Sequence, residues 1–175
     1  MAAGNRAFVS LGSNQGESDK NLQRALKYIE CLADVETLRT SSVYWTQPQG
    51  VTDQPWFANQ VIMVHCGPAW TAQTLLQSLL EIENKLGRVR LQHWGPRTMD
   101  LDLLLYGHLT LSEPNVHIPH PRMHQRAFVL IPLQEIAPDL RFPSGETVGD
   151  MLSTLRYTVK DHQIWQQGKP DLHPL

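Results

Sequence analysis

Apolar residues along the chain fall into short runs and into periodic series, and the two patterns predict different elements. Short runs rich in apolar, β-branched and aromatic residues predict β-strands. These runs are bounded by Gly, Pro, Asn and Ser, which favour turns. The predicted strands occupy residues 7–11, 37–46, 57–66 and 99–106, and a turn at Gly107-His108 leads to a short partner strand around 109–111.

Apolar residues spaced three or four positions apart predict helices between and after these strands. Thr71 and Thr147 are the expected N-caps, because a threonine hydroxyl can accept a hydrogen bond from the first turn. Gly87 is the expected end of the second helix. The predicted helices cover about residues 19–32, the stretch from Thr71 to Gly87, residues 128–136 with an interruption near Pro132, and residues 148–155.

The irregular alternation of strands and helices, with two adjacent strands in the middle, predicts an α+β sandwich. In this fold class, helices pack on a largely antiparallel sheet. Because no internal repeat appears, we expect a single domain over residues 1–175, with a loosely ordered tail from about residue 163 to 175.

The composition is that of a folded domain of ordinary size. Of the 175 residues, 41% are hydrophobic and 18% charged, and the net charge of −2 argues against a general binder of nucleic acid or anionic membranes. Neither Cys31 nor Cys66 is in a CxxC pair, so both are expected to be reduced, buried thiols. No apolar run has the length of a signal peptide or a membrane span, which predicts a cytoplasmic protein.

Two carboxylates stand close together on the strand predicted at 99–106. Asp100 and Asp102 are two residues apart, so they point to the same face, about 6.5 Å apart. Two ionised carboxylates at that distance repel each other unless one is protonated or a cation lies between them. Short acidic side chains without a nearby cysteine suit Mg²⁺ rather than zinc. The alternative is a solvated strand face whose acids pair with Arg97.

Arginines gather around this acidic pair in the sequence. Arginine binds phosphate oxygens through a planar, bidentate group, and acids for a metal surrounded by arginines are what phosphoryl transfer requires. Arginines that only solubilise a loop are the competing interpretation. The five that flank the pair are Arg88, Arg90, Arg97, Arg122 and Arg126.

Other candidate groups are weaker when each is taken alone. His120 lies between two prolines that restrict its backbone, and it could donate a hydrogen bond to a phosphate. The glycine-containing loop at 12–16 joins a strand to a helix, where an anion could bind. It matches neither a Walker sequence nor GxGxxG, so a turn that requires glycine is the favoured interpretation. Aromatic residues beside the two long predicted loops could stack a flat heterocycle whose edge the Asn59 amide reads. They are Trp45, Trp56, Phe57, Trp94 and Phe128.

Several separate segments together resemble one family, the 6-hydroxymethyl-7,8-dihydropterin pyrophosphokinases of folate biosynthesis. The resemblance runs from Leu11-Gly-Ser-Asn14 to Ile136-Ala-Pro138. Its matching segments are 42–50, 54–59, Ile82-Glu83, Gly87-Arg-Val-Arg90, Trp94-Gly-Pro-Arg97-Thr-Met-Asp100-Leu-Asp102, Ile118-Pro-His120-Pro and Arg126-Ala-Phe128-Val-Leu.

The resemblance implies a ferredoxin-like α+β fold and a Mg²⁺-dependent enzyme. This enzyme would move an intact pyrophosphoryl group from ATP to the hydroxymethyl oxygen of the dihydropterin and release AMP. Its partners would be these two small molecules. Nothing in the sequence demands more than a monomer, and the charge balance argues against nucleic acid or membrane partners. The implied ligands of two Mg²⁺ ions are Asp100 and Asp102, which also count as catalytic together with Arg88 and Arg97.

The resemblance also assigns positions around each substrate. The residues implied in nucleotide binding are Glu83, Arg90, Arg97, His120 and Arg126. The residues implied on or beside the pterin are Gly12, Thr46, Pro48, Gln49, Phe57, Asn59, Trp94 and Phe128. Asp102 is the candidate for taking the proton of the hydroxyl group.

Three alternatives differ from this reading in what they require. A glycoside hydrolase would use the paired carboxylates but gives no reason for the arginines. An RNA-binding module would need a basic surface and aromatic residues on a central strand, which the chain lacks. A kinase that releases ADP needs the same charges, so the residues alone leave it open.

Overall fold

The computed structural model describes residues 4–48, 53–87 and 97–167. Its centre is a seven-stranded sheet in the order β5-β1-β4-β3-β9-β8, with β2 also paired to β4. All pairings in this sheet are antiparallel except that of β3 with β9. The strands are β1 (Asn5–Ser13), β2 (Val35–Thr40), β3 (Tyr44–Thr46), β4 (Phe57–Cys66), β5 (Asp100–Tyr106), β8 (Arg156–Lys160) and β9 (Gln163–Gln167).

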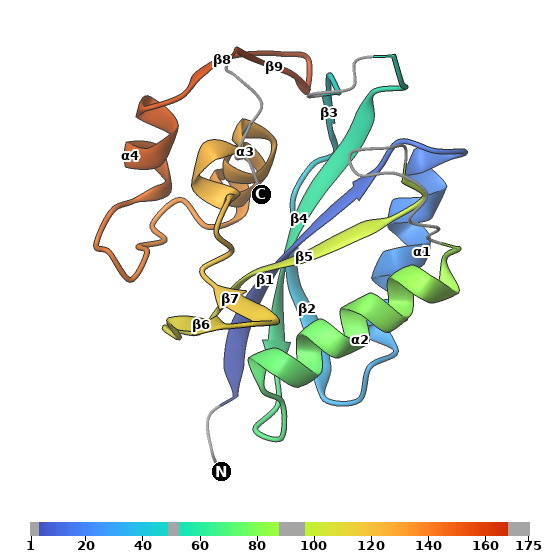
Figure 1. Ribbon diagram of the computed structural model, residues 1–175, viewed down its shortest axis with the longest axis vertical. Coiled ribbons are helices and arrows are strands. Elements are labelled where there is room, and N and C mark those ends of the chain that lie inside the picture. The colour runs from blue at the N-terminus through green and yellow to red at the C-terminus, as the bar shows by residue number, and fades with distance from the viewer. Residues whose placement is uncertain (1–3, 49–52, 88–96, 168–175) are drawn as a thin grey trace.

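Helices cover both faces of the sheet (Figure 1). One face carries α1 (Ser18–Glu30) and α2 (Ala72–Lys85), and the other carries α3 (Ala127–Ile136), with α4 (Val148–Ser153) packed outside it. With the short β3 set aside, β1, α1, β2, β4, α2 and β5 form a βαββαβ succession, and the strand order β5-β1-β4-β2 is the ferredoxin-like arrangement. The expected α+β fold with a largely antiparallel sheet is therefore confirmed.

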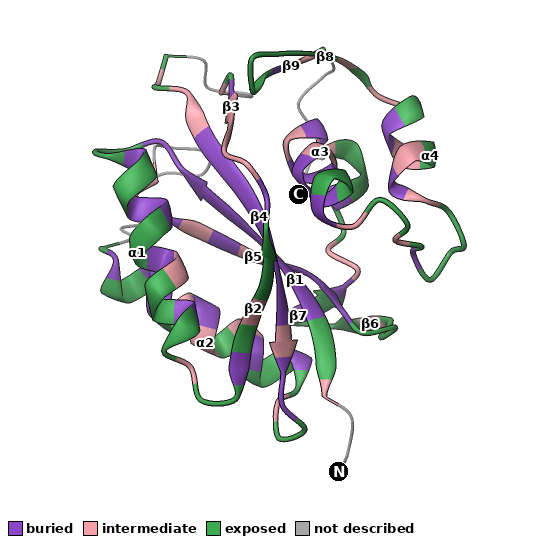
Figure 2. Cartoon of the chain, turned by 180° about the vertical axis from the view of Figure 1, so that it is seen from behind, coloured by how far each residue is buried: buried purple, intermediate pink, exposed green. Residues whose placement is uncertain are grey.

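The alternation of β1 explains how one strand serves two cores. Val9 and Leu11 face α1 and α2, whereas Phe8 packs into the second core beneath α3. Successive side chains of a strand point to opposite faces, so an apolar strand with both faces covered stays buried along its length. Figure 2 shows β1 and β4 largely buried, as their central position requires.

The predicted helix ends agree with the caps in the structure. The Thr71 hydroxyl accepts a hydrogen bond from Thr74 N, and the Thr74 hydroxyl accepts one from Thr71 N in return. Thr147 forms the same kind of reciprocal cap with Asp150. Each cap satisfies backbone N–H groups that have no partner within the first turn.

One predicted strand, at 37–46, is in fact two. At the break between β2 and β3, the Ser41 hydroxyl accepts a hydrogen bond from Val61 N, and the Ser41 carbonyl accepts one from Gln60 Nε2. These bonds add to the backbone bond from Ser41 N to Val61 O, and the regular ladder with β4 is interrupted here before it resumes at β3.

The strand predicted after Gly107-His108 also differs. Residues of β6 (Leu111–Glu113) pair with β7 (Val116–Ile118) in a separate two-stranded sheet, not with β5. The outer edge of β5 is occupied instead by the chain that follows β7, where His120 N donates to Leu104 O at 2.9 Å.

Two further predictions were wrong in part. Pro132 lies inside α3 without interrupting it. Although proline cannot donate its helical hydrogen bond, the neighbouring side chains of Leu130 and Leu133 are fully buried and hold the helix against the sheet. Residues 163–167 of the expected loose tail form β9, and residues 168–175 lie outside the described part.

Only one of the two cysteines is buried, in contrast to the expectation from the sequence. Cys66 is buried, but Cys31 is exposed because it caps the C-terminal end of α1 beyond its buried face. Both are free thiols. Within residues 4–48, 53–87 and 97–167, none of the helices is long and apolar enough to cross a bilayer.

Candidate active site

The acidic pair of β5 belongs to a row of residues that crosses three strands. Asp100 lies opposite Gly12 of β1, and Gly12 lies opposite Asn59 of β4. Asp102 lies opposite Ser10 in the next row of the same face. Directly opposed residues in an antiparallel pair share a face, so the sheet itself assembles these side chains.

A pocket opens over this row, on the sheet face that also carries α3. A side chain at Gly12 would start 3.4 Å from Asn59 Oδ1 and 4.0 Å from Asp100 Cβ, so its absence leaves the floor of the pocket open. The residues that line the pocket are Ser10, Gly12, Gln47, Gln54, Phe57, Asn59, Arg97, Asp100, Asp102, Arg126 and Phe128.

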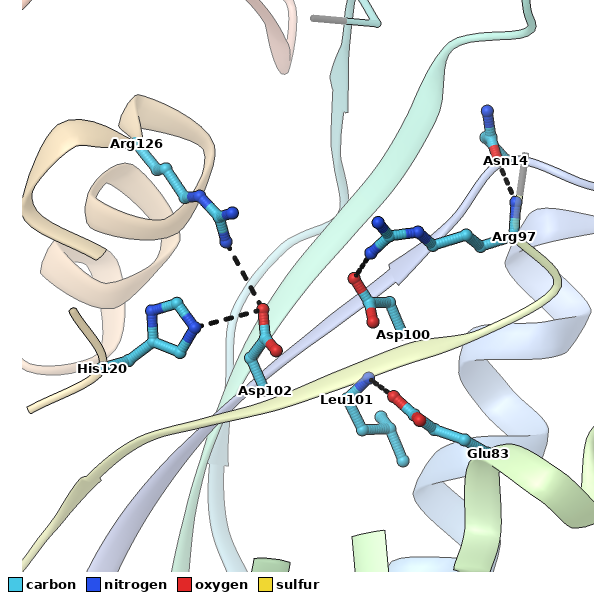
Figure 3. Close-up of polar contacts among 8 residues, drawn as sticks. All are labelled: Asn14, Glu83, Arg97, Asp100, Leu101, Asp102, His120 and Arg126. Atoms are coloured by element: carbon cyan, nitrogen blue, oxygen red, sulfur yellow. Dashed lines mark hydrogen bonds and ion pairs between the residues drawn. The ribbon is translucent and has the colours of Figure 1, made fainter. Parts of the chain in front are cut away.

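Each carboxylate of the pair has its own basic partner (Figure 3). Asp100 Oδ2 accepts a hydrogen bond from Arg97 Nη1. Asp102 Oδ2 lies 3.4 Å from Arg126 Nη1 and 3.8 Å from His120 Nε2. Two guanidinium groups and an imidazole, from three segments of the chain, thus surround two acids on one strand, and the two arginines supply the positive charge that a site for phosphates requires.

Burial changes the basicity of two of these partners. The pKa of His120 is lowered chiefly because burial disfavours the charged imidazole, and the cations of Arg126 and Arg122 add to this effect, whereas the Asp102 carboxylate opposes it. Burial likewise lowers the pKa of Arg126, although a guanidinium remains charged near neutral pH. Burial therefore favours the neutral form of the His120 imidazole, which can still donate or accept a hydrogen bond.

Part of the pocket lining is aromatic or carries an amide. Phe57 and Phe128 are lining residues from β4 and α3, and the guanidinium of Arg126 lies 5.5 Å from the centre of the Phe128 ring. Asn59 Nδ2 donates to Thr46 Oγ1 at 2.8 Å and to Phe57 O at 3.2 Å. These bonds fix the amide so that its oxygen faces the position above Gly12. A flat, polar-edged heterocycle suits such a wall.

A buried asparagine ties together two segments beside the pocket. Asn14, only 2% exposed, donates through Nδ2 to Gln54 Oε1 at 3.0 Å and to Pro55 O at 3.1 Å. Its Oδ1 accepts from Arg97 N at 2.8 Å, a contact drawn in Figure 3. One side chain thereby fixes the backbone before Asp100 relative to the segment that leads into β4.

The two carboxylates of β5 suit Mg²⁺, which needs few protein ligands, better than a metal that is bound by protein side chains alone. In the described part of the chain, no group of three or more His, Cys, Asp or Glu side chains is arranged to hold a metal. Asp100 and Asp102 nevertheless offer two hard oxygen ligands on one face of β5. Mg²⁺ commonly takes one or two carboxylates and completes its shell with water and substrate phosphates, so the residues fit that ion.

The structure brings together most of the site residues that the sequence singles out and that it describes. Gly12, Phe57, Asn59, Arg97, Asp100, Asp102, Arg126 and Phe128 line the pocket, whereas Thr46 and His120 contact its lining residues. Pro48 is not a lining residue. Gln49, Arg88, Arg90 and Trp94 lie outside the described residues.

Glu83 has a different environment from the one that direct nucleotide contact suggests. It lies on α2, is 2% exposed, and accepts a hydrogen bond from Leu101 N at 2.6 Å. Because the Leu101 N–H lies between the two acids in sequence, Glu83 helps to fix the backbone of β5 where the pair projects (Figure 3). A contact with nucleotide stays a prediction.

Three lining residues were not among the predicted site residues. Ser10 has a signal in the sequence, because it is two residues before Gly12 and must share its face. Gln47 and Gln54 both lie in the segment between β3 and β4. Their signal in the sequence is that they fall within the segments 42–50 and 54–59 that resemble the family, although no site role was assigned to them.

A family model described as 7,8-dihydro-6-hydroxymethylpterin-pyrophosphokinase matches residues 8–138. The chain is also similar to two bacterial proteins named 2-amino-4-hydroxy-6-hydroxymethyldihydropteridine pyrophosphokinase. It is 43% identical to that of Pseudomonas aeruginosa over 85% of this chain and 90% of the relative. It is 41% identical to that of Haemophilus influenzae over 83% of this chain and 90% of the relative.

Among solved structures, the chain resembles the Plasmodium falciparum HPPK-DHPS bound to SDX-DHP, with a TM-score of 0.65 and 14% identity. It also resembles an HPPK-DHPS in complex with substrates, with a TM-score of 0.68 and 12% identity. These matches cover 93% and 94% of this chain but only 49% and 48% of the solved chains, so it spans about half their length. At such identities the likeness concerns the fold alone.

Proposed function

This chain belongs to the 7,8-dihydro-6-hydroxymethylpterin-pyrophosphokinase family, and we propose that the pocket over Asp100, Gly12 and Asn59 is where its reaction takes place. The reaction is transfer of the pyrophosphoryl group of ATP to 6-hydroxymethyl-7,8-dihydropterin in folate biosynthesis. Family membership leaves the glycosidase and RNA-binding alternatives without support.

The observation that carries the proposal is the placement of the acidic pair. Asp100 and Asp102 lie between Arg97 on one side and Arg126 with His120 on the other. The same pocket has a wall with Phe57 and Phe128. A charged half for phosphates thus adjoins an aromatic half for a heterocycle, and the transferred group must travel between them.

Asp100 and Asp102 are the residues that would hold Mg²⁺, and we assign two ions to this pair. When bound, the metal neutralises triphosphate oxygens and favours attack at the β-phosphorus. The carboxylates fit this role because both face the pocket from one rigid strand.

The chain's own residues supply orientation and charge. The guanidinium groups of Arg97 and Arg126 bind phosphate oxygens and stabilise the charge that develops on the entering and leaving oxygens. Neutral His120 donates a hydrogen bond to a phosphate oxygen. Asp102 accepts the proton of the pterin hydroxyl as its oxygen bonds to the β-phosphorus and the bond to the AMP oxygen breaks. Arg88 is proposed to act with Arg97 in binding phosphate oxygens and stabilising this charge.

The remaining assignments follow the two halves of the pocket. Phe57 and Phe128 stack the pterin, the Asn59 amide reads its edge, and Thr46 orients that amide. The bare backbone of Gly12 gives the ring room. Pro48, Gln49 and Trp94 complete the proposed pterin side, and Glu83 and Arg90 the proposed nucleotide side.

We further assign the whole chain to one domain that works as a monomer in the cytoplasm. The charged and the aromatic residues of the proposed pocket lie together within one chain, which is what a monomer requires.

The test is an incubation of purified protein with ATP, Mg²⁺ and 6-hydroxymethyl-7,8-dihydropterin, followed by separation of the nucleotides. We expect AMP and pterin diphosphate in a one-to-one ratio. ADP as the product would exclude pyrophosphoryl transfer, and Mg²⁺-independent turnover would overturn the role of the two carboxylates.

A further inference from the structure

The C-terminal hairpin β8–β9 lies beyond residues 8–138, the span that the family model matches. In Figure 1 it spans the space between β3 and the layer of α3 and α4. We propose that Gln166, on β9, is a positioning residue that holds Arg126 at the phosphate end of the pocket. The inference rests on the proposed function, because it concerns the same site.

Gln166 makes a two-point contact with the backbone on both sides of Arg126. Its Oε1 accepts a hydrogen bond from Ala127 N at 2.8 Å. Its Nε2 donates to Gln125 O at 2.7 Å. Both distances are short for bonds of this type. The side-chain amide therefore brackets the residue that carries the guanidinium, although the two lie forty positions apart in the chain.

The start of α3 explains why an outside group is needed there. Arg126 is the N-cap of α3, and no side chain provides a capping hydrogen bond from that position. The first N–H groups of a helix have no partner within the helix. Ala127 is fully buried, so water cannot satisfy its N–H. Gln166 supplies the missing acceptor from a different strand.

Fixing the backbone at this point fixes the direction of the guanidinium. The Arg126 side chain is only 18% exposed, reaches Asp102 Oδ2 at 3.4 Å and passes over the Phe128 ring. A long side chain directed from a loose helix start would sample other positions. Small displacements of a group that aligns phosphates lower turnover strongly.

The strand that carries Gln166 is itself paired with β3, whose Thr46 contacts the pocket-lining residue Asn59. β9 pairs in parallel with β3, where Thr46 is opposite Ile164, and Ile164 is buried. The Thr46 hydroxyl in turn holds the Asn59 amide. Through Gln166, β9 contacts the backbone beside Arg126, and through its pairing with β3 it supports Thr46, which holds Asn59.

The experiment compares Gln166→Leu with Gln163→Leu. The first substitution removes both hydrogen bonds at nearly constant volume, and the second changes an exposed glutamine of the same strand. We expect Gln166→Leu to lower kcat about 10- to 100-fold and Gln163→Leu to leave it within about twofold of the parent. Gln166→Ala removes the same two bonds and serves as a second variant. Parental kcat in both Gln166 variants would overturn the inference.

A double-mutant cycle with Arg126→Ala separates positioning from a general structural effect. If Gln166 acts through Arg126, adding Gln166→Leu to the Arg126→Ala protein should lower kcat by less than about twofold. Losses that multiply independently would show that Gln166 does not act through the arginine.

Hydrogen exchange provides a readout that needs no turnover. The Ala127 amide should exchange at least about tenfold faster in Gln166→Leu than in Gln163→Leu, because its buried N–H loses its acceptor. Unchanged exchange would refute the contact itself. If the parent protein forms no AMP, the proposed function is contradicted. If the parent forms AMP and Gln166→Leu has the same kcat as the parent, only this inference is contradicted.

Discussion

Asn14 offers the sharpest test of how the pocket is held together. Its amide joins Gln54 and Pro55 on one side to Arg97 on the other, through three side-chain hydrogen bonds of 2.8 to 3.1 Å. Asn14→Ala removes all three. Asn14→Asp retains an oxygen that can accept from Arg97 N but loses both donor bonds.

The expected cost follows from burial. Each intramolecular hydrogen bond contributes about 0.5–1.5 kcal/mol net, and a partner left without one in a buried place adds to the loss. Because Asn14 is 2% exposed, we expect Asn14→Ala to lower the free energy of unfolding by about 2–4 kcal/mol. In a domain of this size, that corresponds to a drop in Tm of roughly 4–16 °C.

The effect on turnover should exceed what stability explains, because Asn14 orients both Arg97 and the segment that contains Gln54. We expect kcat/KM of Asn14→Ala to fall about 10- to 100-fold at a temperature where the protein is fully folded. Asn14→Asp should retain more of the Arg97 geometry and lose less of kcat.

Asn21 gives the matched control. It is also a buried asparagine, and its Nδ2 donates to Ser13 Oγ at 3.2 Å and to Gln15 O at 2.9 Å. Asn21→Ala should lower Tm comparably with a much smaller loss of turnover. Thermal unfolding and steady-state assays on the three variants decide the matter. Equal turnover losses in Asn14→Ala and Asn21→Ala would refute the positioning role, as would a parental Tm in Asn14→Ala.

Three further predictions concern the metal, the floor of the pocket and a tyrosine of β3. Asp100→Asn and Asp102→Asn should each abolish turnover at saturating Mg²⁺ while pterin binding, measured by fluorescence, is partly retained. Gly12→Val should raise the pterin KM at least about tenfold, with little change in Tm, because its added methyl groups enter the pocket. Burial raises the pKa of Tyr44 to about 12, and the hydrogen bond to Glu135 and the negative charge of Glu135 add to this effect. The contribution of Tyr44 to the free energy of unfolding should therefore be lost as the pH rises from 10 to 12.

The controls for these predictions differ. Near-parental rates in either aspartate variant would contradict the metal assignment. Gly12→Ala, which adds only one carbon at contact distance, should raise KM less than the valine variant does. For Tyr44, the difference in unfolding free energy between parent and Tyr44→Phe should be constant below pH 10 and shrink above it. A difference that grows with pH would reverse the sign of the argument.

Part of the site and of the fold could be predicted from the sequence, because these features depend on short-range periodicity along the chain. Asp100 and Asp102 had to share a face of one strand, and the threonines before α2 and α4 had to be caps, since both inferences need only a few neighbouring residues. The resemblance added the roles of Arg97, His120 and Arg126, which spacing alone could not assign.

Other features depend on contacts between distant segments, and no local pattern encodes them. Ser41 breaks one expected strand into two through its bonds to β4. Likewise, residues after 162 pair with β3 instead of forming a loose tail, because a parallel partner exists only once the sheet has assembled. Such pairings are decided by the whole fold.

The sequence by itself determined the fold class, the acidic pair and the alternation that places it on one face of a strand. Only the tertiary structure decided that Gly12 and Asn59 stand beside that pair, and that Gln166 reaches back to bracket Arg126. The reason is physical. Strand periodicity is a property of the local backbone, whereas register and long-range hydrogen bonds are fixed by the joint packing of segments that are far apart in the chain.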